Sequence, residues 1–142
     1  MQSSTTLDQV MTPDPMKLPQ RASLMDAAKA MRNDDIGAVI VVDPDGAICG
    51  LVTDRDIVVR GVAEGKRTDK TTLGDICSRK LSALTPSNTI GDAVRLMVTR
   101  SVRRIPVVQD GVAVGIVSLG DLALLQDPDS ALGSISTAPP NA

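Results

Sequence analysis

The sequence predicts a mixed α/β fold in which two similar repeats pack on each other about a pseudo-twofold axis. The segment Leu7–Thr12 returns 66 residues later as Leu73–Ser78, and most later features recur at the same offset. One turn is shorter by a residue, so the offset is 65 from Gly50 and Gly115 onwards. A unit of about 60 residues buries little core alone, so the two repeats are expected to stabilise each other.

Each repeat is expected to begin with a capped helix. Ser23 with Asp26, and Thr89 with Asp92, have the hydroxyl-to-carboxylate spacing of a capping box. Apolar residues then recur on one helical face. They are Leu24, Ala27, Ala28 and Met31 in the first repeat, and Ile90, Ala93, Val94 and Met97 in the second.

A strand, a hairpin turn and a second strand follow in each repeat. The strands are short and rich in β-branched residues, which favours buried strands, and the turns contain Asp and Gly. The three segments are 38–42, 43–46 and 48–52 in the first repeat, and 105–108, 109–111 and 112–117 in the second.

The composition of the 142 residues, with 42% hydrophobic side chains and a net charge of −2, is typical of a soluble globular protein. No run approaches the roughly 18 apolar residues of a membrane span, and residues 1–6 lack the features of a secretory signal. We therefore expect a cytoplasmic protein with no membrane partner.

Several function classes are disfavoured. The weak acidity and the absence of Phe, Tyr and Trp argue against nucleic-acid binding, and a bound base would have to lie between aliphatic side chains. The chain has no His, which is the usual general base and the commonest metal ligand. We expect no metal site and no enzyme. Cys49 and Cys77 are interpreted as small buried hydrophobes rather than a disulfide, with redox sensing a minor option.

One motif that could carry chemistry occurs twice: a glycine, two apolar residues, a hydroxyl, two variable residues and an aspartate. It runs from Gly50 through Thr53 to Asp56, and from Gly115 through Ser118 to Asp121. A structural interpretation is that the hydroxyl and the carboxylate only cap a helix. A functional one is that the free N–H groups bind phosphate, the glycine admits a ligand to the backbone and the carboxylate binds ribose.

With these motifs both halves resemble cystathionine-β-synthase (CBS) domains, and the chain resembles a stand-alone bacterial CBS pair, or Bateman module. The resemblance covers about Leu7 to Gln126 and implies two β-α-β-β-α repeats. The expected boundaries are 7–66 and 73–126 for the repeats, 67–72 for the linker, and 1–6 and 127–142 for flexible tails.

The resemblance implies a non-enzymatic regulatory module that binds an adenosine-type nucleotide in clefts between the repeats. AMP is favoured over ATP, ADP, NAD and S-adenosylmethionine, and no cofactor is required. In that family, residues at the positions of Thr53, Asp56, Ser118 and Asp121 contact phosphate and ribose. The alternative is a structural or protein-interaction module with vestigial clefts. Apolar helical faces predict a homodimer, and the regulated protein must be a separate, unidentified chain.

Basic residues distinguish the two repeats. Arg103 and Arg104 precede a strand, at the position from which members in the regulatory subunit of AMP-activated protein kinase reach ligand phosphates, although a solvated strand end explains them equally well. The first repeat has Gly37 and Ala38 there. We therefore expect two unequal clefts, with Arg55 compensating in part or pairing with its neighbour or solvent.

Overall fold

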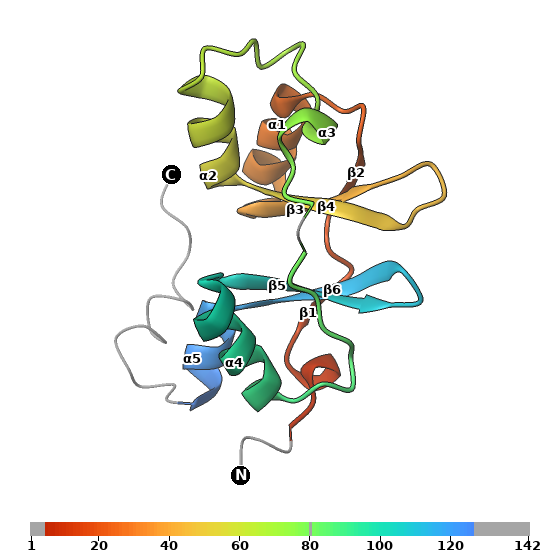
Figure 1. Cartoon of the computed structure of the whole chain (residues 1–142), viewed down its shortest axis with the longest axis vertical. Coiled ribbons are helices and arrows are strands. Elements are labelled where there is room, and N and C mark those ends of the chain that lie inside the picture. Colours follow the sequence, from red (N-terminus) through yellow and green to blue (C-terminus); the bar gives the residue numbers. More distant parts are fainter. Residues whose placement is uncertain (1–4, 80, 127–142) are drawn as a thin grey trace. The chain divides into compact units, whose positions relative to one another are not determined.

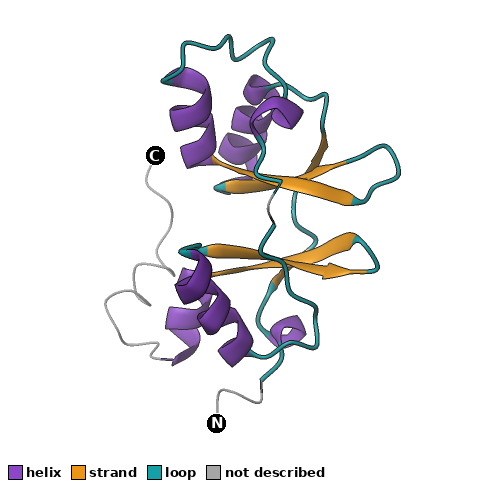
Figure 2. Ribbon diagram, in the orientation of Figure 1, coloured by secondary structure: helices purple, strands orange, loops and turns teal. Residues whose placement is uncertain are grey.

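The computed structural model describes residues 5–79 and 81–126, which fall into two compact units. One unit is Pro15–Leu81. The other, which we call the split unit, combines the described residues up to Asp14 with those from Ser82 onwards. Each contains a three-stranded sheet with helices against it (Figures 1 and 2). The predicted tails lie outside the described residues, except for Thr5 and Thr6.

The unit Pro15–Leu81, which we call the continuous unit, has its sheet in the order β2-β3-β4. Strand β2 is parallel to β3, and β3 is antiparallel to β4 with a register shift between Val41 and Val42. Its elements are β2 (Lys17–Pro19), α1 (Leu24–Asp34), β3 (Ala38–Val42), β4 (Ile48–Thr53), α2 (Asp54–Asp56), the π-helix η3 (Ile57–Val62) and α3 (Leu73–Ile76).

The split unit has its sheet in the order β1-β6-β5, with both pairs antiparallel. A single parallel bridge between Leu84 and Val107 stands where the continuous unit has β2. Its elements are the 3-10 helix η2 (Leu7–Gln9), β1 (Thr12–Pro13), α4 (Ile90–Arg100), β5 (Arg104–Gln109), β6 (Val112–Ser118) and α5 (Leu119–Gln126). The predicted mixed α/β fold and the repeated order of elements are confirmed.

The opening segment of each repeat packs on the other repeat. The Leu7 N–H donates to Asn88 O at 2.9 Å, and strand β1 pairs with β6. One period later, the Leu73 N–H donates to Ala22 O at 2.8 Å, and Ser78 bridges Leu51 on β4. Leu7 and Leu73 are both fully buried in the core that receives them. Each unit is therefore completed by a segment that belongs, by sequence, to the start of the other repeat.

The predicted capping boxes hold the starts of the two long helices. The Asp26 N–H donates to Ser23 Oγ at 3.1 Å, and the Ser23 N–H donates to the Asp26 carboxylate at 3.0 Å. The bond from the Ser23 N–H, helped by the Ser23 hydroxyl, holds the pKa of Asp26 below its usual range, because hydrogen bonds to the carboxylate favour its charged form. Thr89 and Asp92 make the same pair of bonds at the start of α4.

The two cysteines lie on the core of the continuous unit. Cys77 is buried, as predicted, and burial raises the pKa of its thiol. Cys49 is only half-buried: its Sγ donates to Val41 O at 3.2 Å and accepts from Gln20 Nε2 at 3.0 Å. Separately, none of the helices in the described part of the chain is both long and apolar enough to cross a membrane.

Candidate functional site

The repeated motif lies where the second strand of each sheet ends and a helix begins. Thr53 is the last residue of β4 and caps α2, and Ser118 is the last residue of β6 and precedes α5. The Asp56 N–H donates to Thr53 Oγ1 at 3.1 Å, and the Thr53 N–H donates to Asp56 Oδ2 at 2.9 Å. The corresponding distances for Ser118 and Asp121 are 3.1 and 3.0 Å. Both motifs are therefore capping boxes, with nearly equal geometry.

Capping leaves room for a ligand role. An ionised carboxylate offers about four lone-pair positions, and the capping bond takes one of them. Both Asp56 and Asp121 use Oδ2 in the cap and are half-buried rather than enclosed. Each carboxylate can hold its helix start and still accept from ligand hydroxyls. The capping role is confirmed, and a ligand role for the same residues stays a prediction.

The strand beside each motif carries the residues that distinguish the repeats. In the register of the sheets, Ala38 lies opposite Thr53 and Arg104 lies opposite Ser118. Both units also have a backbone hydrogen bond from the first residue of the helix to the residue before the neighbouring strand. In the split unit the Leu119 N–H donates to Arg103 O at 2.8 Å. Its counterpart runs from the Asp54 N–H to Gly37 O at 3.0 Å.

The structure thus gathers the predicted site residues into two groups, one in each unit. Arg103, Arg104, Ser118 and Asp121 come together in the split unit. Thr53, Arg55 and Asp56 come together in the continuous unit, where Arg55 has an exposed side chain on α2 and its N–H donates to the Asp54 carboxylate at 2.8 Å. The first group has one arginine at the first position of β5 and a second just before it, whereas the second group has no basic residue at the start of β3.

The glycine of the motif has a different role from the predicted one. A Cβ added at Gly50 would lie 2.6 Å from Cys77 Sγ, and one added at Gly115 would lie 2.8 Å from Met11 Cγ. Both distances are shorter than real Cβ contacts, so a protein side chain fills the space beside each glycine. The interpretation that these glycines admit a ligand to the backbone is wrong. Each glycine instead makes room for the side chain of an opening segment: Cys77 beside Gly50, and Met11 beside Gly115. The sequence signal for this role was that Met11 and Cys77 occupy equivalent positions, 66 residues apart.

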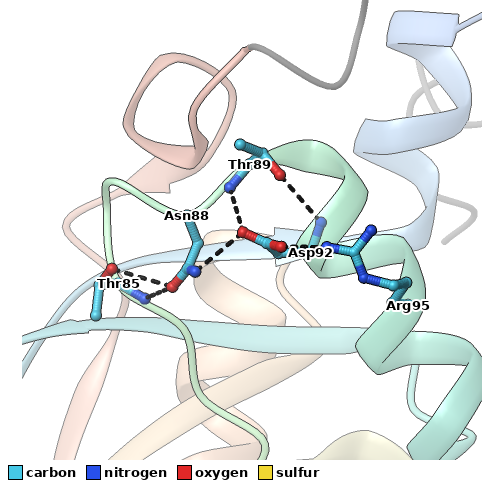
Figure 3. Close-up of polar contacts among 5 residues, drawn as sticks. All are labelled: Thr85, Asn88, Thr89, Asp92 and Arg95. Carbon is cyan, nitrogen blue, oxygen red and sulfur yellow. Dashed lines mark hydrogen bonds and ion pairs between the residues drawn. The ribbon is translucent and has the colours of Figure 1, made fainter.

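A polar network at the start of α4 was not predicted beyond its capping box (Figure 3). The Asp92 carboxylate accepts from the Thr89 N–H at 2.9 Å, from Asn88 Nδ2 at 3.0 Å, and from Arg95. Asn88 Oδ1 in turn accepts from the Thr85 N–H at 2.8 Å. The backbone bond from Thr89 is the main cause of a lowered pKa at Asp92, and the Asn88 amide adds to it. These bonds tie the start of α4 to the loop before it.

Metal ligands are not clustered in the described part of the chain. No group of three or more His, Cys, Asp or Glu residues there could hold a metal ion.

Comparison with known proteins places these features in context. The family model for the CBS domain matches residues 7–61 and 73–126. The CBS domain-containing protein YhcV of Bacillus subtilis is 37% identical over 115 residues, which cover 81% of each chain. Hypoxic response protein 1 of Mycobacterium tuberculosis is 32% identical over 119 residues, covering 84% of this chain and 83% of that one.

Solved structures share the architecture. Hypoxic Response Protein I with two coordinated zinc ions is 32% identical with a TM-score of 0.75, and the match covers 84% of this chain and 97% of that one. The CBS domain pair of protein MJ0100 in complex with 5-methylthioadenosine and S-adenosyl-L-methionine is 25% identical with a TM-score of 0.78. That match covers 86% of this chain and 99% of that one.

Proposed function

This chain belongs to the CBS-domain family, and we propose that it is a non-enzymatic regulatory module that binds an adenosine-type nucleotide. AMP is the favoured ligand, ahead of ATP, ADP, NAD and S-adenosylmethionine. The observation that carries the proposal is the hydroxyl–aspartate motif, which stands at the same strand–helix boundary in both units with nearly equal hydrogen-bond geometry. The adenosyl ligands of the MJ0100 domain pair support it.

The phosphate is assigned to the split unit. Arg104 stands opposite Ser118 in the sheet, and the exposed Arg103 precedes it on the same strand end. Guanidinium groups bind phosphate bidentately, and a helix start adds N–H groups and a positive dipole end. Two guanidinium groups and a hydroxyl at one helix start suit an anion better than the neutral strand end at Gly37 and Ala38.

The ribose is assigned to the carboxylates. A pair of vicinal hydroxyls needs an acceptor of two hydrogen bonds, and a carboxylate held in place by its own cap is a preorganised acceptor. Asp121 in the split unit and Asp56 in the continuous unit are carboxylates held in this way. With phosphate favoured beside Arg103 and Arg104, the two motifs are expected to bind nucleotide with different affinity.

The proposal includes a homodimer. Valine side chains are exposed on helical surfaces of both units: Val58 and Val62 at 57% each on η3, and Val94 and Val98 at 39% and 75% on α4. A second copy that covers them would remove apolar surface from water. Sedimentation equilibrium at micromolar concentration should give the mass of two chains, and the mass of one chain would refute the dimer.

A second candidate is an interaction module whose motifs bind nothing. It is favoured by the capping bonds, because the hydroxyl and the carboxylate of each motif are already paired within the protein. Under this alternative the chain would act through its surfaces alone, and nucleotides would not change its melting temperature.

Two measurements decide between the candidates. Mass spectrometry of small molecules released from the purified protein by denaturation should detect an adenine nucleotide. Calorimetry should then show AMP binding more tightly than GMP. No heat and no melting shift with any adenine nucleotide at millimolar concentration would favour the interaction module.

A further inference from the structure

The two sheets differ at the edge where β2 pairs with β3. In the continuous unit this parallel ladder includes a bond from the Ile40 N–H to Met16 O at 2.8 Å and one from the Gln20 N–H to Val42 O at 3.2 Å. In the split unit β5 corresponds to β3, and within the described residues its pairing on that side is the single bridge at Leu84. The split unit has therefore lost the hydrogen bonds on either side of the bridge.

Two prolines explain the loss. Pro106 and Pro86 stand 66 residues after Ile40 and Gln20, which are the donors of the two bonds in the continuous unit. Proline has no backbone N–H, so neither residue can donate to a ladder. The bond between these positions remains, because the Leu84 N–H donates to Pro106 O at 3.1 Å. The chain before Leu84 thus reaches β5 without forming a strand there.

One consequence is that the carbonyl of Ser82 has no donor. Ser82 stands at the position of Met16, whose carbonyl accepts from the Ile40 N–H in the continuous unit. In the part of the chain that the structure describes, Ser82 O accepts no hydrogen bond, and Ser82 is half-buried. A partly buried carbonyl gains stability when it accepts a hydrogen bond. Ser82 O is therefore a candidate acceptor for a ligand group.

This carbonyl belongs to the same end of the sheet as the arginines to which the phosphate is assigned. Ser82 comes two residues before Leu84, which is bonded to Pro106. Pro106 in turn follows two residues after Arg104, which lies opposite Ser118. Two residues of a strand span about 7 Å, so the steps from the arginine to the carbonyl are short. A nucleotide with its phosphate at Arg104 can extend along β5 and direct its base towards Ser82.

We infer that Pro106 determines base selectivity in the split unit, because it leaves the Ser82 carbonyl able to accept from the exocyclic amine of adenine. The inference rests on the proposed function and names the group that selects the base. Adenine has an amine donor at this position, whereas guanine has an oxygen acceptor, which a carbonyl repels. In the continuous unit Met16 O already accepts from the Ile40 N–H, so the same selectivity is not expected there.

The test is Pro106→Ile, which restores the donor with the residue type that the first repeat has at the equivalent, equally buried position 40. The unsubstituted protein should bind AMP about tenfold more tightly than inosine monophosphate, which has an oxygen in place of the amine. In the variant AMP should weaken about tenfold, while inosine monophosphate changes little. If AMP binds and its preference is the same in both proteins, the inference is overturned and the proposed function stands. If no nucleotide binds the unsubstituted protein, both are overturned.

Pro86→Gln is the matched control. It restores the other lost bond, to Val108 O, with the residue type of Gln20, and leaves the Ser82 carbonyl without a donor. Its preference for AMP should therefore equal that of the unsubstituted protein. Hydrogen exchange adds a readout that does not depend on ligand, because the amide at position 106 of Pro106→Ile should exchange slowly when it donates to Ser82. A rapidly exchanging amide there, or an equal loss of AMP affinity in Pro86→Gln, would overturn the inference.

Discussion

The continuous and split units build the same motif and surround it differently. Thr53 with Asp56, and Ser118 with Asp121, make the same two capping bonds within 0.1 Å. Yet the adjoining strand begins with Ala38 in one unit and Arg104 in the other, and the following helix is π in one and α in the other. The shared part is what the fold needs to start a helix. The parts that differ are where ligand preference and conformational response can diverge.

The largest expected effect tests whether the segment that opens each repeat is buried in the core formed by the other repeat. Leu7→Ala should cost about 2–5 kcal/mol, because Leu7 is fully buried in the core of the split unit. Native-state hydrogen exchange should show the loss of protection first in β5 and β6. Leu73→Ala is the matched control and should act first on β3 and β4. Equal loss in both sheets for each variant would contradict the assignment of these segments.

The next largest effect tests the motif glycines. Gly115→Ala should cost about 1–3 kcal/mol of stability from overpacking against Met11, measured by urea unfolding. Met11→Ala removes the clashing atoms, so the double variant should be more stable than the sum of the single effects predicts. Additive effects would mean that the glycine is needed for another reason.

The arginine pair tests the difference in phosphate binding. Replacing Arg103 and Arg104 by Ala should weaken AMP about tenfold or more, since charge-assisted hydrogen bonds contribute about 1.5–3 kcal/mol each. Affinity for adenosine, which has no phosphate, should change little. Calorimetry with both ligands separates the outcomes, and equal weakening would show that the pair shapes the fold instead.

The smallest effect is on stability in acid. Asp75 is part of a third capping box, in which the Thr72 N–H at the start of α3 donates to its carboxylate at 3.1 Å. The pKa values of Asp26, Asp75 and Asp92 are all lowered, chiefly by the backbone hydrogen bonds from Ser23, Thr72 and Thr89. Their contribution is therefore fully present above about pH 4, the ordinary carboxyl pKa, and is lost as pH falls through the lowered values. Melting temperature should fall below pH 4, and less steeply in Asp92→Asn. An identical slope in that variant would exclude Asp92 as a contributor.

Local sequence signals predicted most of the fold. Capping boxes, β-branched runs and Asp-Gly turns identified the helices and strands, because each depends on residues close in the chain. The packing of each opening segment on the other repeat was not predicted. Nothing in the sequence near Leu7 indicates that its N–H donates to the carbonyl of Asn88. The π-helix was missed for a similar reason: poor helix propensity at Ile57–Val62 was visible, but the contact of Gly61 with Leu24 requires the fold.

The candidate site was predicted in part. Sequence identified the residues of both motifs and the unequal strand ends, and the sheet register places Arg104 opposite Ser118. The role given to Gly50 and Gly115 was wrong, because the side chains that fill the space beside them come from distant segments. The ligand roles of the seven site residues remain predictions.

The measurement that tests the central claim most directly is AMP binding to Asp121→Asn, with the melting of the ligand-free variant as its control. If Asp121 binds ribose as well as capping α5, affinity should fall about ten- to a hundredfold, which corresponds to the loss of about 1.5–3 kcal/mol of charged hydrogen bonding. The ligand-free variant should melt close to the unsubstituted protein, because a lost charge at a helix start costs only about 0.3–1 kcal/mol. Unchanged affinity for every adenine nucleotide, together with a lower melting temperature, would contradict the claim and leave Asp121 as a helix cap alone.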